Sequence, residues 1–314
     1  MNNGNKVVLI GDGFVGSSYA FSLVNSTLAS ELAIIDIRKD KEVSDVNDLL
    51  DATVLTPSAT LVRSGSYKDC KDADLVVLAY GNSQKNLVNR LDDIKISTEM
   101  VLDTIPKVVE NGYDGVILLA TNPVDVIARV VEEVSGFPSE RIVGTGTSLD
   151  SARFAQYLAL ETGFNVADIN AYVIGEHGNS SVAVWSNANI NGIGIDRFID
   201  NIDESYKDKV GELIRDKAFR IIKGKGATHF GIANCLLAFT RAILLDEKRV
   251  LMASAKLNGE YKNEGLYTGV PTVIGKNGAE KILEMPIDKR EQDMFDKSCM
   301  DLKKNFLLAD LNRN

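Results

Sequence analysis

Short apolar runs and longer amphipathic stretches alternate along the first 144 residues of the chain. The runs have the length of buried strands, and the stretches between them have helical periodicity. Strands are expected at about 6–10, 32–36, 74–80, 115–120 and 141–144, and helices at about 14–28, 41–55, 92–111 and 124–135. Because strands that alternate with crossover helices pair in parallel, the pattern predicts a doubly wound parallel α/β sheet over residues 1–144.

The pattern changes after residue 144. A long helix is expected first, followed by strands, two further helices, more strands and a C-terminal helix. These elements fall at about 148–162, 169–175, 181–186, 203–223, 228–246, 249–274 and 288–310. Residues 145–314 are therefore predicted to form a second, mixed α+β domain, which follows the first without a flexible linker.

The first apolar run leads into the hexapeptide Gly11-Asp12-Gly13-Phe14-Val15-Gly16. Between a strand and a helix, such glycines permit a tight turn, close approach of the backbone to a pyrophosphate, and close packing of helix on strand. Asp36 ends the second run, where its carboxylate would accept hydrogen bonds from an adenosine ribose. The motif predicts a Rossmann-type domain that binds NAD rather than NADP. Arg38 is either a solvated loop residue or a partner for a 2′-phosphate.

Composition and charge narrow the class of protein. The 314 residues are 45% hydrophobic and 25% charged with a net charge of −9, which fits a globular chain and argues against nucleic-acid binding. Cys70, Cys235 and Cys299 are widely spaced without a C-x-x-C pair, which argues against a disulfide framework and favours a reducing, cytoplasmic location. With no signal-peptide core and no apolar segment of membrane-spanning length, neither secretion nor membrane insertion is expected.

Only two histidines, His177 and His229, can serve chemistry that needs titration near neutral pH. His177 lies between glycines in Gly175-Glu176-His177-Gly178, where an apolar run ends and a loop opens. It is the stronger acid–base candidate, with a packing or capping role as the alternative. His229 begins a predicted helix and needs no catalytic role. The two histidines lack metal-ligand spacing, so no metal site is predicted.

Asp150 and Arg153 lie three residues apart, so a helix would place them on one face. Asp150 is the natural candidate to orient a catalytic histidine. Arg153 could hold a substrate carboxylate with its planar guanidinium group. From spacing alone, helix capping by Asp150 and a plain ion pair between the two residues remain open.

Four motifs occur in a characteristic order: Gly11–Gly16, Ala120-Thr121-Asn122-Pro123-Val124-Asp125, Leu149–Phe154 and Ile174-Gly175-Glu176-His177-Gly178. With them the chain resembles the L-lactate dehydrogenases over nearly its whole length. Gly178-Asn179-Ser180, followed by Trp185-Ser186, also resembles the bacterial L-2-hydroxyisocaproate dehydrogenases. The resemblance implies a cytoplasmic NAD-dependent oxidoreductase of glycolysis and fermentation. It also implies a small 2-oxo or 2-hydroxy acid substrate and a homo-oligomer, either tetramer or dimer.

The resemblance implies catalytic roles for four residues. His177 is expected to give a proton to the keto oxygen, while Asp150 stabilises its imidazolium form. Arg153 is expected to bind the substrate carboxylate. Arg90, at the end of a loop that starts at Gly81, is expected to polarise the substrate carbonyl when that loop closes.

Further contacts are implied for the substrate and the cofactor. Asn122 is expected to hydrogen-bond the substrate oxygen, although it could belong to a simple turn. Thr228 is expected to line the pocket, with an N-cap as its alternative role. The expected cofactor contacts are Gly11, Gly13, Phe14, Val15, Gly16, Asp36, Tyr67, Gly81, Asn82, Ala120, Asn122 and Thr145.

The loop before Arg90 bears on the choice of substrate. Gln84 stands where malate dehydrogenases place an arginine, so a second substrate carboxylate would find no fixed cation there. Family loops usually continue with Pro-Gly-Glu-Thr, but this chain has Asn86-Leu87-Val88-Asn89, whose apolar residues could pack over a longer side chain. Pyruvate is the predicted substrate, with longer or branched 2-oxo acids as the alternative. A non-catalytic NAD-binding protein is the alternative from another class.

Overall fold

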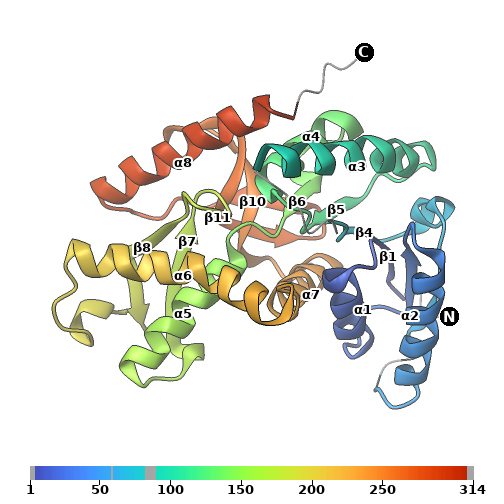
Figure 1. Ribbon diagram of the computed structural model, residues 1–314, viewed down its shortest axis with the longest axis horizontal. Helices are drawn as coiled ribbons and strands as arrows, with labels where there is room; N and C mark the ends of the chain where they lie inside the picture. The colour runs from blue at the N-terminus through green and yellow to red at the C-terminus, as the bar shows by residue number, and fades with distance from the viewer. Residues whose placement is uncertain (1–3, 58, 82–89, 310–314) are drawn as a thin grey trace.

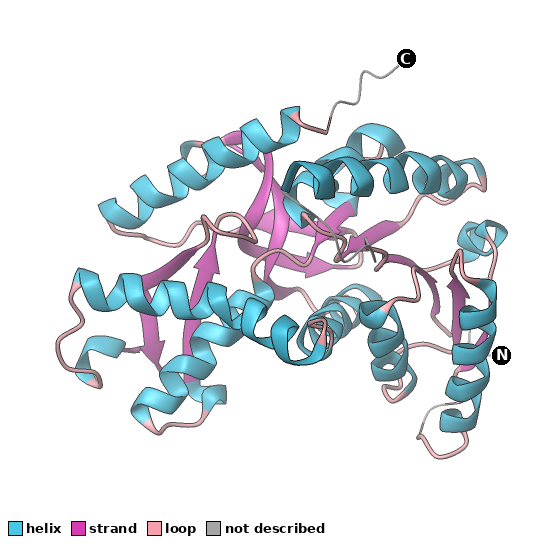
Figure 2. Ribbon diagram, in the orientation of Figure 1, coloured by secondary structure: helices cyan, strands magenta, loops and turns pink. Residues whose placement is uncertain are grey.

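The computed structural model describes residues 4–57, 59–81 and 90–309. In this part of the chain the central sheet has nine strands, in the order β12-β11-β10-β6-β5-β4-β1-β2-β3. A separate sheet of three strands, β7-β8-β9, stands beside it. Helices cover both faces of the central sheet (Figure 1, Figure 2).

The first half of the chain supplies six parallel strands. They are β1 (Lys6–Ile10), β2 (Glu31–Ile35), β3 (Leu61–Ser64), β4 (Leu75–Leu78), β5 (Val116–Leu119) and β6 (Ile142–Gly144). Five of them are the predicted apolar runs, because strands covered on both faces carry apolar side chains on both sides. The crossovers include α1 (Phe14–Val24), α2 (Lys39–Thr53), α3 (Arg90–Glu110), α4 (Val124–Ser135), η1 (Tyr67–Asp72) and η2 (Ser139–Arg141). The predicted doubly wound parallel sheet is confirmed.

The second half of the chain extends the same sheet. Strands β10 (Arg249–Asn258), β11 (Glu264–Gly275) and β12 (Gly278–Ile282) are antiparallel, and β10 joins β6 where Ser254 pairs with Gly144. The small sheet contains β7 (Ile169–Ile174), β8 (Val182–Ile190) and β9 (Ile193–Gly194). The helices of this half are α5 (Ser148–Thr162), α6 (Glu204–Lys225), α7 (Phe230–Leu244) and α8 (Lys289–Leu307), with short turns η3 (Val166–Asp168), η4 (Ile195–Arg197) and η5 (Glu260–Lys262).

The two faces of the central sheet have separate apolar cores. Residues of α3, α4 and α8 pack on one face, and residues of α1, α2 and α7 pack on the other. Helix α7 therefore belongs to the second half of the sequence but packs against α1 of the first half. Between these helices the hydroxyl groups of Tyr19 and Thr240 are buried and 2.7 Å apart.

No single helix of the described residues is long and apolar enough to cross a membrane. Helices α6 and α7 reach the required length and composition only as a pair, which is bent by 120°.

The parallel strands place several predicted site residues at one edge of the sheet. Gly11 follows β1, Asp36 follows β2, Ala120 follows β5 and Thr145 follows β6. Because the strands run parallel, these carboxyl ends lie side by side, which is where doubly wound sheets bind their ligands. The fold thus brings together residues that are far apart in the sequence.

Candidate active site

His177, Asp150 and Arg153 form one hydrogen-bonded group. The Nδ1 atom of His177 lies 2.6 Å from Asp150 Oδ2, and Arg153 Nη1 donates to Asp150 Oδ1 over 3.1 Å. Asp150 and Arg153 are buried, whereas the His177 side chain is 25% exposed. Both carboxylate oxygens of Asp150 thus accept hydrogen bonds from side chains. Asp150 therefore orients these side chains and does not cap the helix. Because Nδ1 is held by Asp150, Nε2 is the ring nitrogen of His177 that can serve a ligand.

The backbone around His177 is fastened to three other elements. The amide of His177 donates to Asp125 Oδ2 of α4 over 2.8 Å, and the amide of Glu176 donates to Ser298 Oγ of α8 over 2.9 Å. Gly175 exchanges two 2.9 Å backbone hydrogen bonds with Gly269 of β11. Its φ of +89° is a conformation that favours glycine. These contacts fix the histidine at the end of β7.

Helix α5 is joined directly to β7, the strand that leads to His177. Val173 donates its amide to Ser151 Oγ over 2.9 Å, and Thr147 Oγ1 donates to the Val173 carbonyl. Helix and strand therefore hold a fixed register. This explains how Asp150, in the first turn of α5, meets a histidine 27 residues further along the chain.

Electrostatics favour an ion pair between His177 and Asp150. The negative charge of Asp150 raises the pKa of His177 above its usual value, against the opposing effect of burial. Burial alone would raise the pKa of Asp150, but the charges of His177 and Arg153 hold it below its usual value. The histidine is thus stabilised in its protonated form, and the carboxylate stays ionised beside it.

The glycine-rich loop between β1 and α1 fits a dinucleotide pyrophosphate. Gly11 has a φ of +100°, and a Cβ atom at Gly16 would lie 1.9 Å from the Gly11 carbonyl oxygen. At Gly13, in contrast, a Cβ atom would meet nothing within 4 Å. Gly13 is the N-cap of α1, and no side chain caps this helix. The amides of its first turn are therefore available to an anion at this open position.

Asp36 lies beside this loop. Its Oδ2 atom accepts from the Asp12 amide over 2.6 Å, and its Oδ1 atom accepts from the Arg38 amide over 2.8 Å. Burial works against ionisation, but the backbone hydrogen bonds from Arg38 and Asp12 leave the pKa of Asp36 below its usual value. The guanidinium of Arg38 also contacts Asp36, with 3.4 Å between Nε and Oδ1. The Arg38 side chain is 54% exposed, so it is a solvated residue that also contacts Asp36.

The other residues predicted to contact the substrate or the cofactor differ in their solvent exposure. Thr145 is buried, Ala120 and Tyr67 are partly buried, and Asn122 and Gly81 are exposed. Asn122 precedes a cis peptide bond to Pro123, and its carbonyl accepts from Ser97 Oγ over 2.7 Å. Phe14 and Val15 open α1, and Phe14 is exposed. Asn82 and Gln84 lie outside the described residues, and Arg90 is described only as the first residue of α3.

Thr228 and His229 lie between α6 and α7. The alternative role of Thr228 as an N-cap is not found, since the N-cap of α7 is His229. His229 Nδ1 lies 2.8 Å from Ser18 Oγ of α1, and its ring stacks on Phe14 at 5.6 Å. His229 therefore joins α7 to α1, in keeping with a structural role.

Two residues that hold the site could not be identified from the sequence. Asp125 lies in a motif used for the resemblance, but nothing in its spacing links it to the amide of His177. Its second carboxylate oxygen accepts from Ser254 Oγ over 2.6 Å. Ser298 is a lone buried serine on an amphipathic helix. Both contacts span more than fifty residues, so only the fold brings them together.

No group of three or more potential metal ligands occurs in residues 4–57, 59–81 and 90–309.

Two family models match the chain. Residues 5–144 match the NAD binding domain of lactate/malate dehydrogenases, and residues 147–309 match their alpha/beta C-terminal domain. Together these matches cover nearly the whole chain.

Individual relatives agree with the family models. L-lactate dehydrogenase 2 of Staphylococcus aureus strain Newman is 45% identical over 306 residues, 96% of each chain. The minor L-lactate dehydrogenase of Enterococcus mundtii, solved with ligands bound, has a TM-score of 0.93 at 36% identity over 96% of this chain and 98% of that one. A lactate dehydrogenase from a Medee basin deep-sea metagenome has a TM-score of 0.93 at 35% identity over 98% and 99%. The chain therefore belongs to the lactate/malate dehydrogenase family and is an NAD-dependent oxidoreductase that acts on a CH–OH group.

Proposed function

We propose that the protein is an L-lactate dehydrogenase, which interconverts pyruvate and L-lactate. The observation that carries this proposal is the buried Asp150 between His177 and Arg153. The group combines an acid that can protonate a keto oxygen with a cation that can hold a carboxylate. A 2-oxo acid carries both of these functional groups on adjacent carbon atoms.

His177 is proposed as the acid and base of the reaction. When bound, NADH supplies the hydride that reduces the C2 atom of the substrate. The oxygen at C2 then gains negative charge, and His177 gives it the proton on Nε2. Asp150 holds the resulting imidazole by its Nδ1 atom and stabilises the charged form in the reverse direction. The charge of Asp150 raises the pKa of His177, which favours the acid form.

Arg153 is proposed to bind the substrate carboxylate. One of its nitrogens donates to Asp150, which leaves further N–H groups of its planar fork for the substrate. Asn122, whose side chain is exposed at the end of β5, is proposed to donate to the substrate oxygen. Arg90 is proposed to polarise the same carbonyl, and Thr228 to line the pocket.

We further propose that residues 1–144 form the NAD-binding domain and residues 145–314 the substrate-binding domain. The open position at Gly13 would receive the pyrophosphate, and Asp36 would accept from the adenosine ribose. The remaining proposed cofactor contacts are Gly11, Phe14, Val15, Gly16, Tyr67, Gly81, Asn82, Ala120, Asn122 and Thr145. A cytoplasmic homo-oligomer, tetramer or dimer, is the proposed form of the enzyme.

Pyruvate is the proposed substrate, and the choice rests on Gln84, which offers no charge to a second carboxylate. Longer or branched 2-oxo acids are the second candidate, because Leu87 and Val88 replace a glycine and a glutamate of the family loop. A steady-state comparison of kcat/KM for pyruvate, 2-oxobutyrate, 4-methyl-2-oxopentanoate, phenylpyruvate and oxaloacetate separates these cases. Pyruvate should rank first. A preference for 4-methyl-2-oxopentanoate would instead identify an L-2-hydroxyisocaproate dehydrogenase, and a preference for oxaloacetate would refute the role of Gln84.

A further inference from the structure

A groove between α6 and α8 lies behind the loop that carries His177. Two adjoining cavities form it, and they share Ser181, Arg215 and Met294. The larger cavity has a volume of about 520 Å³, which is within the range of small-molecule sites. Glu176 and Ser180, the neighbours of His177 in the loop, line this cavity. The groove thus borders the loop that carries His177.

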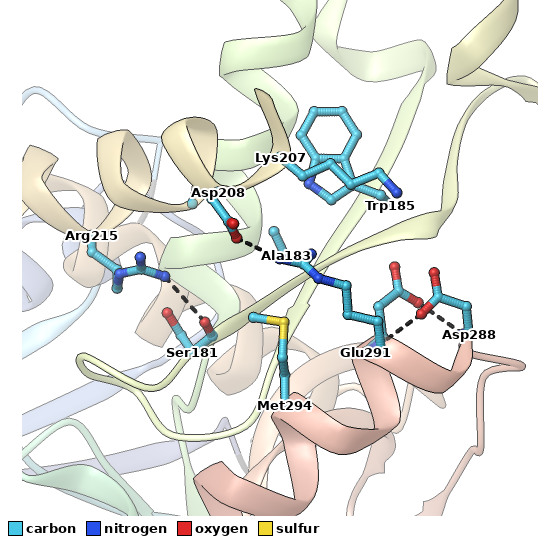
Figure 3. A pocket seen from close by; sticks show the side chains of 11 residues that line it. Ser181, Ala183, Trp185, Lys207, Asp208, Arg215, Asp288, Glu291 and Met294 are labelled. Carbon is cyan, nitrogen blue, oxygen red and sulfur yellow. Dashed lines mark hydrogen bonds and ion pairs between the residues drawn. The ribbon is translucent and has the colours of Figure 1, made fainter. Parts of the chain in front are cut away.

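The smaller cavity is shown in Figure 3. Arg215 of α6 reaches toward Ser181, where its Nη1 atom donates to the carbonyl oxygen over 3.4 Å. Trp185 of β8 lies elsewhere on the wall, 7% exposed, and its indole Nε1 has no hydrogen-bond partner within the described chain. Trp185 is the only tryptophan of the protein. It is therefore a specific reporter of events in the groove.

Most charged groups of the groove already have partners. Arg290 lies 2.6 Å from Glu204 and 2.7 Å from Asp208, and Lys304 lies 3.5 Å from Asp301. Glu176 accepts from the Ser180 hydroxyl over 2.6 Å and from Asn305 Nδ2 of α8 over 3.4 Å. Among the residues that line the larger cavity, three cations outnumber two carboxylates, which leaves this cavity weakly positive.

Arg215 and Lys297 differ from the rest. Within residues 4–57, 59–81 and 90–309, neither has a carboxylate within ion-pair distance, although both line the larger cavity. Neutral hydrogen-bonding side chains surround them, from Asn179, Ser180 and Asn305. The cavity therefore combines two unneutralised cations with several polar groups.

We propose that this groove binds a small molecule that carries a phosphate monoester, with Arg215 and Lys297 as its phosphate ligands. A phosphate monoester has close to two negative charges at neutral pH, which two cations neutralise. The planar guanidinium of Arg215 can make two parallel hydrogen bonds to phosphate oxygens, and Lys297 adds a mobile point charge. The volume of the cavity leaves room for the remainder of an ester beside Asn179 and Asn305.

The position of the site suggests a route to the active site. Ser298, the residue after Lys297 on α8, accepts from the Glu176 amide and lies 2.9 Å from Ser180 Oγ. A ligand held by Lys297 is thus one residue away from a contact that fixes the loop of His177. The proposal itself concerns binding, which can be tested without any turnover.

The test is a fluorescence titration of the full-length protein, with Trp185 as the reporter. Inorganic phosphate and glycerol 3-phosphate are the probes, acetate is the monoanion control, and calorimetry on the same samples detects binding that leaves the fluorescence unchanged. A saturable response to both phosphates is expected, with the ester binding at least as tightly. Arg215→Gln and Lys297→Gln should each raise the Kd about tenfold or more. Lys303→Gln, an exposed lysine of the same helix outside the groove, should leave it unchanged.

Three results would overturn the proposal: no saturable binding by either method, equal binding of acetate, or equal Kd values in all variants. Equal values would mean that phosphate binds elsewhere, for example at Arg153 or the glycine-rich loop. Circular dichroism spectra of the variants guard against misfolding, which is not expected because neither substituted cation has an ion-pair partner in the described chain. Since neither NADH nor a 2-oxo acid is present, a failure here is distinct from a failure of the proposed dehydrogenase function.

Discussion

The proposed proton chemistry depends on a single contact, the 2.6 Å hydrogen bond between His177 Nδ1 and Asp150 Oδ2. This contact selects the tautomer that leaves Nε2 for the substrate, and its charge raises the pKa of His177. Asp125 holds the amide of the histidine itself, and Ser298 holds the amide of Glu176 before it. The imidazole is thereby fixed in both position and protonation state.

A first prediction concerns the pH dependence of pyruvate reduction. The reaction needs protonated His177, so kcat/KM should be constant at low pH and fall as pH rises through the raised pKa of His177. Asp150→Asn removes the charge that raises this pKa, and the falling limb should move to lower pH. The measurement is kcat/KM as a function of pH for the natural protein and for Asp150→Asn. An unchanged limb in the variant, with chemistry rate-limiting, would show that Asp150 does not set the protonation of the acid.

A second prediction concerns Asp12, which is fully buried in the glycine-rich loop. Burial raises its pKa to about 7, although Lys41 Nζ lies 2.9 Å from its carboxylate. The folded state therefore binds this proton more tightly than the unfolded chain does, and the stability that it contributes is lost as pH rises from about 4 to 7. Asp12→Asn should gain stability relative to the natural protein across this range. Urea unfolding of both proteins at pH 5 and pH 8 measures their free energies of unfolding. The same change between the two pH values in both proteins would refute the prediction.

At the scale of elements, much of the site could be predicted from the sequence. The strand ends that carry Gly11 and Asp36 were predicted because buried parallel strands are continuous apolar runs. Strand β3 was not predicted, since its residues Leu61-Val62-Arg63-Ser64 lie at a sheet edge and only Val62 is buried. Contacts such as Asp125 with His177 could not be predicted, because they depend on how distant elements pack.

Two glycines of the loop before α1 provide a paired prediction. Gly16→Ala would place a Cβ atom 1.9 Å from the Gly11 carbonyl oxygen, so it should lower the melting temperature of the protein without ligand. Gly13→Ala has open space and should melt like the natural protein, but it should weaken NADH binding because its Cβ would occupy the proposed pyrophosphate position. Calorimetry measures the melting temperature of each variant, and NADH titration measures its affinity for the cofactor. Unchanged NADH affinity in Gly13→Ala would place the pyrophosphate elsewhere.

At the scale of the whole molecule, the two halves of the sequence share their structure. Strands β6 and β10 join them within one sheet, and α7 packs on α1 around the buried Tyr19–Thr240 hydrogen bond. The change of pattern after residue 144 indicates a second domain. This domain also adds three strands to the first sheet, and that could not be predicted because the pattern does not specify antiparallel pairing. The halves are thus expected to unfold together.

This continuity predicts a single unfolding transition. Trp185 reports on the second half and far-UV circular dichroism on the whole chain, so the two melting curves should coincide. NADH at one hundred times its Kd should stabilise the protein by about 2.7 kcal/mol and move both curves upward together. Two separate transitions, with only one shifted by NADH, would show that the halves unfold independently.

The central claim is that His177 protonates a 2-oxo acid as NADH reduces it. The direct measurement is NADH oxidation with pyruvate by the natural protein and by His177→Asn, with L-lactate assayed as the product and NADH affinity measured in both. The natural protein should form one L-lactate for each NADH consumed. The variant should bind NADH with the same affinity but lose turnover, since asparagine cannot give a proton to the alkoxide. Turnover retained by the variant, or NADH binding without turnover in the natural protein, would contradict the claim.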